Sequence, residues 1–190
     1  MKINEIFYSL QGEGHWTGTP MVFVRMAGCN LRCPFCDTEW STFVEMDAEA
    51  VLAEMGKYPA KRVCITGGEP CLQVTEAFLD ILHRHGYTIH MESNGTIVPP
   101  KGVDWLTISP KSPFLKGGEG MLAVEECQEL KLLYPSNPSL FDGVKADYRF
   151  LQPIDEAGKT KENTIATIQY ICAHPQWRMS VQMHKMLDIK

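Results

Sequence analysis

The sequence lacks the features of membrane, secreted and nucleic-acid-binding proteins. No window approaches the roughly 18 consecutive apolar residues of a membrane helix, and residues 1–10 contain no long apolar stretch, so we expect neither a signal peptide nor an anchor. Lysine and arginine are scattered, and the net charge is −5. Proteins that bind the nucleic-acid backbone show a basic face. We therefore expect no nucleic acid and no membrane among the partners.

The chain does have ample apolar material and a local concentration of cysteine. Its 190 residues correspond to a single domain, residues 1–190, and 44% of them are hydrophobic. Three of the seven cysteines lie within eight residues. In a reducing cytosol, crowded cysteines bind metals or clusters more often than they form disulfides. The composition therefore predicts a cytoplasmic protein with a metal or cluster site.

Strand-like and helix-like segments alternate along the chain. Short buried strands that end in polar or glycine-rich turns are predicted at 21–28, 62–68, 88–95, 105–111, 129–135, 148–153 and 178–184. Helices are predicted at 48–57 with Asp47 as N-cap, at 75–85 closed by Gly86, and at 160–173. The stretch 94–122 is rich in proline and glycine, so some crossovers should be loops.

This alternation predicts an α/β fold with a mostly parallel sheet. A full eight-unit barrel takes about 250 residues, more than the chain has. We therefore predict a partial, open (β/α) barrel of about six mostly parallel strands with few helices. Sites in parallel α/β folds form at the carboxyl ends of the strands. The informative residues follow strands, at Cys29, 67–70, 92–95 and 109–111.

Cys29, Cys33 and Cys36 form a C-x3-C-x2-C motif. Thiolates are the natural iron ligands of iron–sulfur clusters, and one short loop supplies three of them here. Three ligands leave one iron open, which catalysis needs and electron transfer does not. From spacing alone, two alternatives remain: a zinc site, for which His15 and Cys64 fit no familiar fourth-ligand spacing, and no metal.

Phe35 precedes the last of these cysteines, and the motif then resembles the C-x3-C-x-aromatic-C signature of the radical SAM superfamily. Residues 67–70 (GGEP) resemble that superfamily's Gly-Gly-Glu segment, although alone they predict only a turn. The resemblance implies that the three cysteines hold a [4Fe–4S] cluster whose open iron binds S-adenosylmethionine (SAM). It implies further SAM contacts from Phe35, Asp37, Gly68, Glu69, Ser109, Pro110, Lys111 and Gln152.

Other segments resemble the 7-carboxy-7-deazaguanine synthases of queuosine biosynthesis, the route to a 7-deazapurine tRNA nucleoside. They are 8–14 (YSLQGEG), 23–25 (FVR), 36–38 (CDT), 66–70 (TGGEP), 92–96 (ESNGT) and 109–111 (SPK). The resemblance implies a carbon–nitrogen lyase that contracts 6-carboxy-5,6,7,8-tetrahydropterin to 7-carboxy-7-deazaguanine with release of ammonia. It also implies that SAM is regenerated and that Mg²⁺ lies beside the substrate carboxylate, an oxygen-ligand site of the usual kind.

The same resemblance assigns Mg²⁺ to Thr38 and substrate contacts to Leu10, Gln11, Gly12, Glu13, Arg25 and Thr66. Local sequence leaves alternatives open. A buried arginine needs a partner, so Arg25 meets either a substrate carboxylate or an internal ion pair. Residues 11–14 (QGEG) alone predict a surface turn, and the Thr38 hydroxyl equally suits a loop cap. Asn94 suits a ligand contact or an Asn-Gly turn. His184 and Lys185 either close the pocket or face solvent.

We also expect a small-molecule pterin substrate, a reducing electron-transfer protein such as flavodoxin, and a homodimer that covers the open side of the barrel. No catalytic side chain is assigned, since the cluster and SAM carry the chemistry. Two other functions remain possible on the cysteine motif. A glycyl-radical activating enzyme would consume SAM while acting on a protein loop, and a non-catalytic iron–sulfur electron carrier would have no use for GGEP.

Overall fold

The structure, a computed structural model, describes residues 1–39, 41–116 and 121–190, and these residues form one nine-stranded sheet. The strand order is β3-β1-β2-β4-β5-β6-β7-β8-β9. The strands from β2 outward to β9 run parallel, whereas β1 runs antiparallel to both β2 and β3. The bounds are β1 Lys2–Leu10, β2 Pro20–Met26, β3 Val44–Glu45, β4 Arg62–Gly67, β5 Thr88–Ser93, β6 Trp105–Ile108, β7 Glu126–Tyr134, β8 Lys145–Pro153 and β9 Arg178–Met179.

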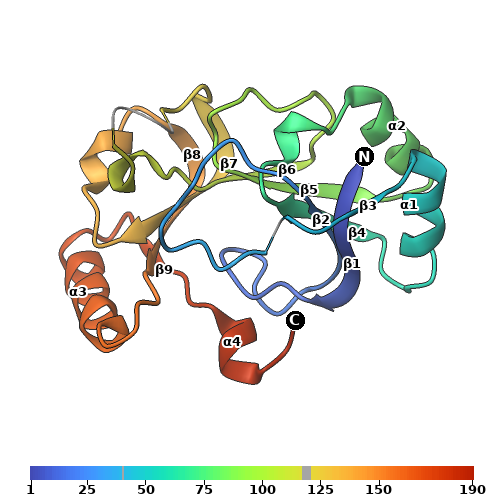
Figure 1. The fold of residues 1–190 in the computed structure, drawn as a ribbon. Helices are drawn as coiled ribbons and strands as arrows, with labels where there is room; N and C mark the ends of the chain where they lie inside the picture. The colour runs from blue at the N-terminus through green and yellow to red at the C-terminus, as the bar shows by residue number, and fades with distance from the viewer. Residues whose placement is uncertain (40, 117–120) are drawn as a thin grey trace.

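The sheet curves into a partial barrel that stays open between its edge strands, β3 and β9 (Figure 1). This confirms the predicted open, mostly parallel α/β barrel. The predicted number of about six strands was too low, because β1 and β3 were not anticipated. Strand β1 carries only two buried side chains, Ile3 and Phe7, so its sequence lacks the apolar run that marks the central strands.

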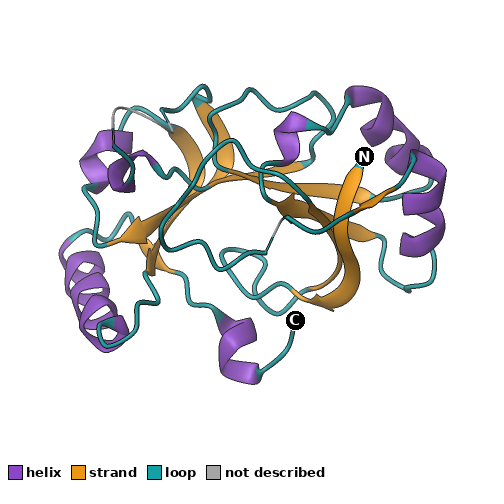
Figure 2. Ribbon diagram, viewed as in Figure 1, coloured by secondary structure: helices purple, strands orange, loops and turns teal. Residues whose placement is uncertain are grey.

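Four α-helices lie among the described residues: α1 (Ala48–Met55), α2 (Glu76–Arg84), α3 (Thr160–Ala173) and α4 (Met183–Leu187). Figure 2 shows that they lie around the sheet and do not fill its concave side. The predicted N-cap is present, since the Asp47 side chain accepts a hydrogen bond from the Ala50 amide. In the described part of 94–122 the crossovers contain no α-helix, as predicted. None of the described helices has the length and apolarity to cross a membrane.

The strands separate apolar from polar side chains by their two-residue period. Val24, Ile65 and Met91 are fully buried on the face that packs against the helices. Their neighbours Arg25, Thr66 and Glu92 point to the concave face, and Arg25 pairs with Thr66 in the β2–β4 register. The concave face thus carries these polar side chains beside a small apolar cluster of Phe7, Met21, Phe23 and Cys64, whereas the larger hydrophobic core lies behind the sheet.

The strand predicted over 178–184 is wrong beyond Met179. The amide of Ser180 donates to the Leu151 carbonyl oxygen at 2.9 Å, and the chain then leaves the sheet. The amide of Met183 donates to the Gly12 carbonyl oxygen at 2.9 Å, which draws the chain across the barrel into α4. Apolar residues in this segment therefore do not continue a strand.

Candidate active site

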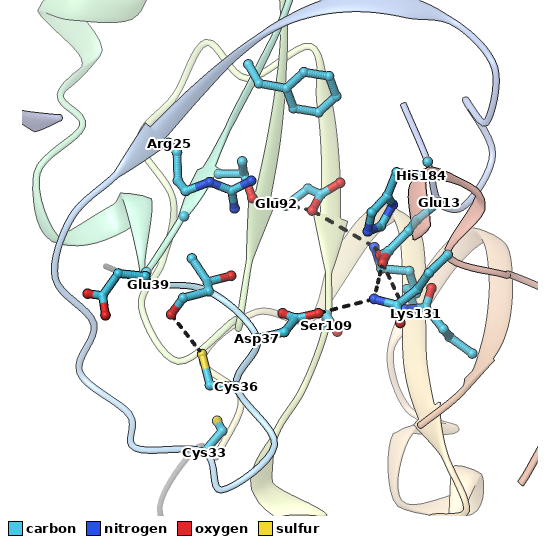
Figure 3. A pocket seen from close by; sticks show the side chains of 18 of the residues that line it. Glu13, Arg25, Cys33, Cys36, Asp37, Glu39, Glu92, Ser109, Lys131 and His184 are labelled. Atoms are coloured by element: carbon cyan, nitrogen blue, oxygen red, sulfur yellow. Dashed lines mark hydrogen bonds and ion pairs between the residues drawn. The ribbon is translucent and has the colours of Figure 1, made fainter. Parts of the chain in front are cut away.

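A cavity of about 810 Å³ lies on the concave side, at the carboxyl ends of the parallel strands. Ligand pockets typically enclose roughly 300–1,000 Å³, so this one suits organic ligands. Three segments complete its walls: the cysteine loop (27–39), the QGEG segment (11–14) and the C-terminal segment (180–190). In Figure 3, Cys33 and Cys36 lie at one end of the pocket, and Glu13, Lys131 and His184 lie together away from them.

The cysteine loop is joined directly to the end of β4. The amide of Gly68 donates to the Met26 carbonyl oxygen at 3.0 Å, and the amide of Glu69 donates to the Gly28 carbonyl oxygen at 2.9 Å. A Cβ on Gly68 would stand 1.9 Å from that same Gly28 oxygen. Glycine is therefore required at position 68, because the two backbones approach too closely for any side chain. The GGEP segment therefore holds the cysteine loop against the end of β4 in addition to forming a turn.

The Glu69 carboxylate lies behind the cavity wall. It is fully buried and accepts hydrogen bonds from the Cys71 amide at 3.0 Å, the Ser93 hydroxyl at 2.9 Å and the Asn94 amide at 2.8 Å. These bonds hold the end of β5 against the end of β4. The side chain thus shapes the site from behind, while its backbone borders the cysteine loop.

The QGEG segment lies inside the barrel. Gln11 and Gly12 are buried, and the Gln11 amide nitrogen Nε2 donates to Glu92 Oε1 at 3.0 Å. Gly14 has a φ of +67°, and a Cβ there would stand 2.0 Å from Glu129 Oε1. The surface-turn alternative is therefore wrong, because strands β5 and β7 surround the segment and its polar groups form the floor of the cavity.

Glu13 stands at the centre of a buried polar cluster. Its carboxylate pairs with the Lys131 ammonium and accepts hydrogen bonds at 3.0 Å from both Gln152 and Gln182. Burial raises the pKa of Glu13, but Lys131 more than offsets this and holds the pKa well below its usual value. Glu13 is therefore an ionised acceptor at neutral pH.

Arg25 takes part in an internal ion pair and also lines the cavity. Its Nε lies 2.9 Å from Glu5 Oε1, and its guanidinium carbon lies 5.6 Å from the centroid of the Phe7 ring. Lys190 Nζ lies 2.9 Å from the other Glu5 oxygen. Of the two alternatives from the sequence, the internal pair is present, and the cavity position still allows a substrate carboxylate to bind.

The C-terminal segment closes one side of the cavity. A Cβ on Gly12 would stand 2.2 Å from His184 Nδ1, so the imidazole packs directly on the QGEG backbone. Lys185 Nζ lies 3.1 Å from Asp37 of the cysteine loop and 3.1 Å from Asp155. His184 and Lys185 thus close the pocket as one of the sequence alternatives predicted, and Figure 1 shows the C-terminus beside β1.

All three motif cysteines are free thiols that line the cavity. Burial raises the pKa of the Cys29 and Cys33 thiols, and Cys36 is exposed. In the described part of the chain, no three His, Cys, Asp or Glu side chains converge on a point where one ion would bind. An iron–sulfur cluster takes its thiolates at separate irons.

Comparisons with known proteins agree with this arrangement. Residues 23–114 match the family described as the Radical SAM superfamily. The chain is 44% identical to the 7-carboxy-7-deazaguanine synthase of Bacteroides thetaiotaomicron, over 100% of this chain and 98% of that protein. The chain belongs to the 7-carboxy-7-deazaguanine synthases. It is therefore a radical SAM enzyme, with a [4Fe–4S] cluster and SAM as cofactors, as the cysteine motif predicted.

Two further relatives cover nearly the whole chain. The 7-carboxy-7-deazaguanine synthase of Bordetella pertussis is 40% identical over 98% of each protein. A crystal structure of QueE from Escherichia coli is 30% identical and superposes with a TM-score of 0.80, covering 96% of this chain and 94% of that one. The similarity thus extends beyond the cysteine motif to the C-terminal third, which sequence motifs matched only weakly.

The residues present fit the cofactors of the family. The three thiols face one end of the cavity, and the backbone of Gly68 borders both them and the cavity. Nearby, Lys111 Nζ donates to Ser109 Oγ at 2.5 Å, and burial lowers the pKa of this lysine. A cation in such a position suits the carboxylate of SAM.

Most of the predicted site residues meet in this one cavity. Those that line it are Leu10, Gln11, Gly12, Glu13, Arg25, Cys29, Cys33, Phe35, Cys36, Asp37, Thr38, Thr66, Gly68, Ser109, Lys111 and Gln152. Glu69 and Pro110 are buried and do not line it. Asn94 lines the cavity and also bonds to the cysteine loop, where its Nδ2 donates to Asn30 Oδ1 at 3.0 Å.

Sequence reasoning missed Lys131 and did not assign Glu92 a role, although both line the cavity. Lys131 lies in the strand predicted at 129–135, and Glu92 begins the ESNGT segment. The signal that identified Arg25, a charged residue inside an apolar strand, applies equally to Lys131. A charge in a buried strand needs a partner, and that rule would have found it.

Proposed function

We propose that this chain catalyses the radical ring contraction of 6-carboxy-5,6,7,8-tetrahydropterin to 7-carboxy-7-deazaguanine, with release of ammonia, in queuosine biosynthesis. The observation that carries the proposal is that the cysteine loop and the QGEG segment border one cavity. A radical must form within reach of the substrate, so both ligands need a shared enclosed space. The names of the relatives from Bacteroides thetaiotaomicron and Bordetella pertussis support the same product.

At the cofactor end, Cys29, Cys33 and Cys36 hold the cluster. When bound and reduced, the cluster and SAM supply the 5′-deoxyadenosyl radical that starts the reaction. The chain positions SAM through the backbone at Gly68 and the polar groups that surround it. The further contacts that we assign to SAM are Phe35, Asp37, Ser109, Lys111 and Gln152, which line the cavity, and Glu69 and Pro110 support the SAM site from behind the cavity wall.

At the substrate end, the residues match a flat heterocycle that carries a carboxylate. Arg25 is the cation on the cavity wall that binds the carboxylate. Glu13 is an acceptor for a ring N–H group, because a carboxylate offers about four acceptor sites and the three donors that reach it from the protein leave one of them. Gln11 and Thr66 add polar contacts beside it, and Thr38 provides a hard oxygen ligand for Mg²⁺.

Three further proposals concern the electron donor, the cellular compartment and the oligomeric state. The cluster needs an electron from a reducing protein, for which we propose flavodoxin. We place the reaction in the cytoplasm, since a reducing compartment keeps crowded cysteines such as the cluster ligands from forming disulfides. The open edge between β9 and β3 favours a homodimer that covers it.

Anaerobic reconstitution tests the function directly. The protein receives iron, sulfide, reductant, SAM, Mg²⁺ and 6-carboxytetrahydropterin, and mass spectrometry follows the deazapurine and 5′-deoxyadenosine together. We expect many equivalents of 7-carboxy-7-deazaguanine for each SAM consumed, because SAM is regenerated. Accumulation of 5′-deoxyadenosine without deazapurine would overturn the substrate and favour a glycyl-radical activating enzyme.

A further inference from the structure

Lys131 is a buried cation on the floor of the cavity. It lies on the concave face of β7, and only 5% of its side chain is exposed. Its ammonium pairs with Glu13 and lies 3.9 Å from Glu92 Oε2. Figure 3 shows Lys131 and Glu13 side by side at the end of the pocket away from the cysteines. A lysine so buried requires compensating charge, and these two carboxylates provide it.

The two carboxylates hold the other polar residues at this end of the cavity. Glu92 accepts hydrogen bonds from Gln11 Nε2 at 3.0 Å and from the Thr66 hydroxyl at 3.4 Å. Lys131 therefore connects two arms of one network: Glu13 on one side, and Gln11 with Thr66 through Glu92 on the other. Removal of its charge affects both arms.

The charged groups around this network set the protonation of Glu13. Besides Lys131 and Glu92, the charged groups that act on it are Glu129 on β7 and Lys111 after β6, and Arg25 on β2 and His184 on α4 line the same cavity. Among these, Lys131 is the cation in contact with Glu13. An isolated carboxylate in a buried site takes up a proton, because burial penalises its charged form. Without Lys131, Glu13 would therefore become a proton donor near neutral pH.

We propose that Lys131 is a positioning residue for the pterin substrate, which holds Glu13 ionised and oriented so that it accepts a hydrogen bond from an N–H group of the substrate's pyrimidine ring. This inference rests on the proposed function and deepens it. Lys131 acts through Glu13 and makes no contact with the reacting atoms. A protonated Glu13 would present an O–H to the N–H edge of the ring, and two donors would face one another.

The test uses the reconstituted holoenzyme and its Lys131→Met, Lys131→Arg, Glu13→Gln and Glu13→Gln/Lys131→Met variants. Equilibrium binding of 6-carboxytetrahydropterin, KM and kcat are measured from neutral to alkaline pH. Formation of 5′-deoxyadenosine without substrate is measured separately as a readout of the cofactor end. Lys159→Met is the matched control, because Lys159 pairs with Glu156 at 2.9 Å but its side chain is 59% exposed, away from the cavity.

For Lys131→Met we expect pterin affinity to fall and KM to rise roughly ten- to a hundredfold at neutral pH. Pterin affinity and KM should both recover partly as the pH rises, because the proton then leaves Glu13, whereas the wild type should show no such recovery. Lys131→Arg keeps the charge and should retain most of the affinity. Uncoupled 5′-deoxyadenosine formation should fall far less than pterin affinity, and Lys159→Met should behave as the wild type.

The double variant separates this role from a structural one. If Lys131 acts through Glu13, adding Lys131→Met to Glu13→Gln should cause little further loss of pterin affinity. Additive losses would overturn the inference, as would an unchanged KM with a flat pH profile in Lys131→Met. If Lys131→Met fails to fold, the comparison of Glu13→Gln with the double variant decides. If the wild type neither binds nor converts the pterin, both the proposed function and this role of Lys131 are wrong. If the wild type converts the pterin and Lys131→Met has the same affinity and KM, only the role of Lys131 is wrong.

Discussion

The amide nitrogen of Glu69 donates a hydrogen bond to the carbonyl oxygen of Gly28 at 2.9 Å. This bond joins the carboxyl end of β4 to the residue that precedes the first cluster cysteine. Gly28 has a φ of +84°, a left-handed conformation that glycine adopts at little cost. The GGEP segment and the cysteine loop are thus parts of a single structural unit, although some thirty residues separate them in the sequence.

Gly68→Ala should disrupt this unit. The new Cβ would stand 1.9 Å from the Gly28 oxygen, and backbone cannot yield as a flexible side chain does. We expect a loss of about 1–3 kcal/mol in the free energy of unfolding and a clear drop in iron bound after reconstitution. Denaturant melts and iron analysis measure the two effects.

Gly143→Ala is the matched control, because no heavy atom stands within 4 Å of a Cβ at that position. It should bind iron and unfold like the wild type. Full iron content in Gly68→Ala would show that the cysteine loop tolerates displacement from β4.

The buried carboxyl group of Glu129 should make the free energy of unfolding depend on pH. Burial raises the pKa of Glu129 to about 7 from its ordinary 4.5, so the native state holds this proton more tightly than the unfolded state does. The stabilising contribution is complete below pH 4.5 and is lost as the pH rises through 7. In Glu129→Gln, the decline in the free energy of unfolding with rising pH should be smaller by about 1–3 kcal/mol. Denaturant melts at a series of pH values measure this difference.

The exposed Glu125→Gln serves as control and should keep the wild-type decline. Parallel stability curves for Glu129→Gln and the wild type across this range would argue that Glu129 is ionised in the native protein.

Lys185→Met should loosen the C-terminal segment without unfolding the protein. Lys185 bridges Asp37 and Asp155 at 3.1 Å each, but its side chain is 38% exposed, so the pairs contribute less than about 1 kcal/mol to stability. We expect the KM for the pterin to rise about three- to tenfold, with more 5′-deoxyadenosine released per deazapurine formed.

Lys159→Met again provides a control, since it removes a comparable surface pair away from the cavity. A Lys185→Met enzyme with wild-type KM and wild-type coupling would remove the closing role of this lysine.

Thr38→Ala should change the response to magnesium and leave the cluster intact. Thr38 lines the cavity two residues after Cys36, where its hydroxyl suits a Mg²⁺ ligand. We expect the Mg²⁺ concentration for half-maximal activity to rise roughly tenfold or more, with iron content unchanged. Thr38→Ser keeps the hydroxyl and should respond like the wild type. Unchanged magnesium dependence in Thr38→Ala would count against the role.

Local patterns were sufficient where the signal lies within a few residues. The sequence predicted the apolar strands β4 and β5 and the N-cap at Asp47, because strand period and helix capping are local effects. The C-x3-C-x2-C spacing and the glycines at 67 and 68 were equally local. Where the chain depends on distant partners, as at α4, the local pattern predicted the wrong element.

The sequence by itself determined the fold class, the cysteine motif and the edge of the sheet at which the site forms. Only the tertiary structure decided that QGEG lies inside the barrel and that Glu13 meets Lys131, 118 residues away. It also decided that the Glu69 carboxylate faces away from the cavity and that the C-terminal segment crosses it. The reason is physical: periodicity reports which face of a strand is buried, whereas the pairing of buried charges depends on how the whole sheet curves.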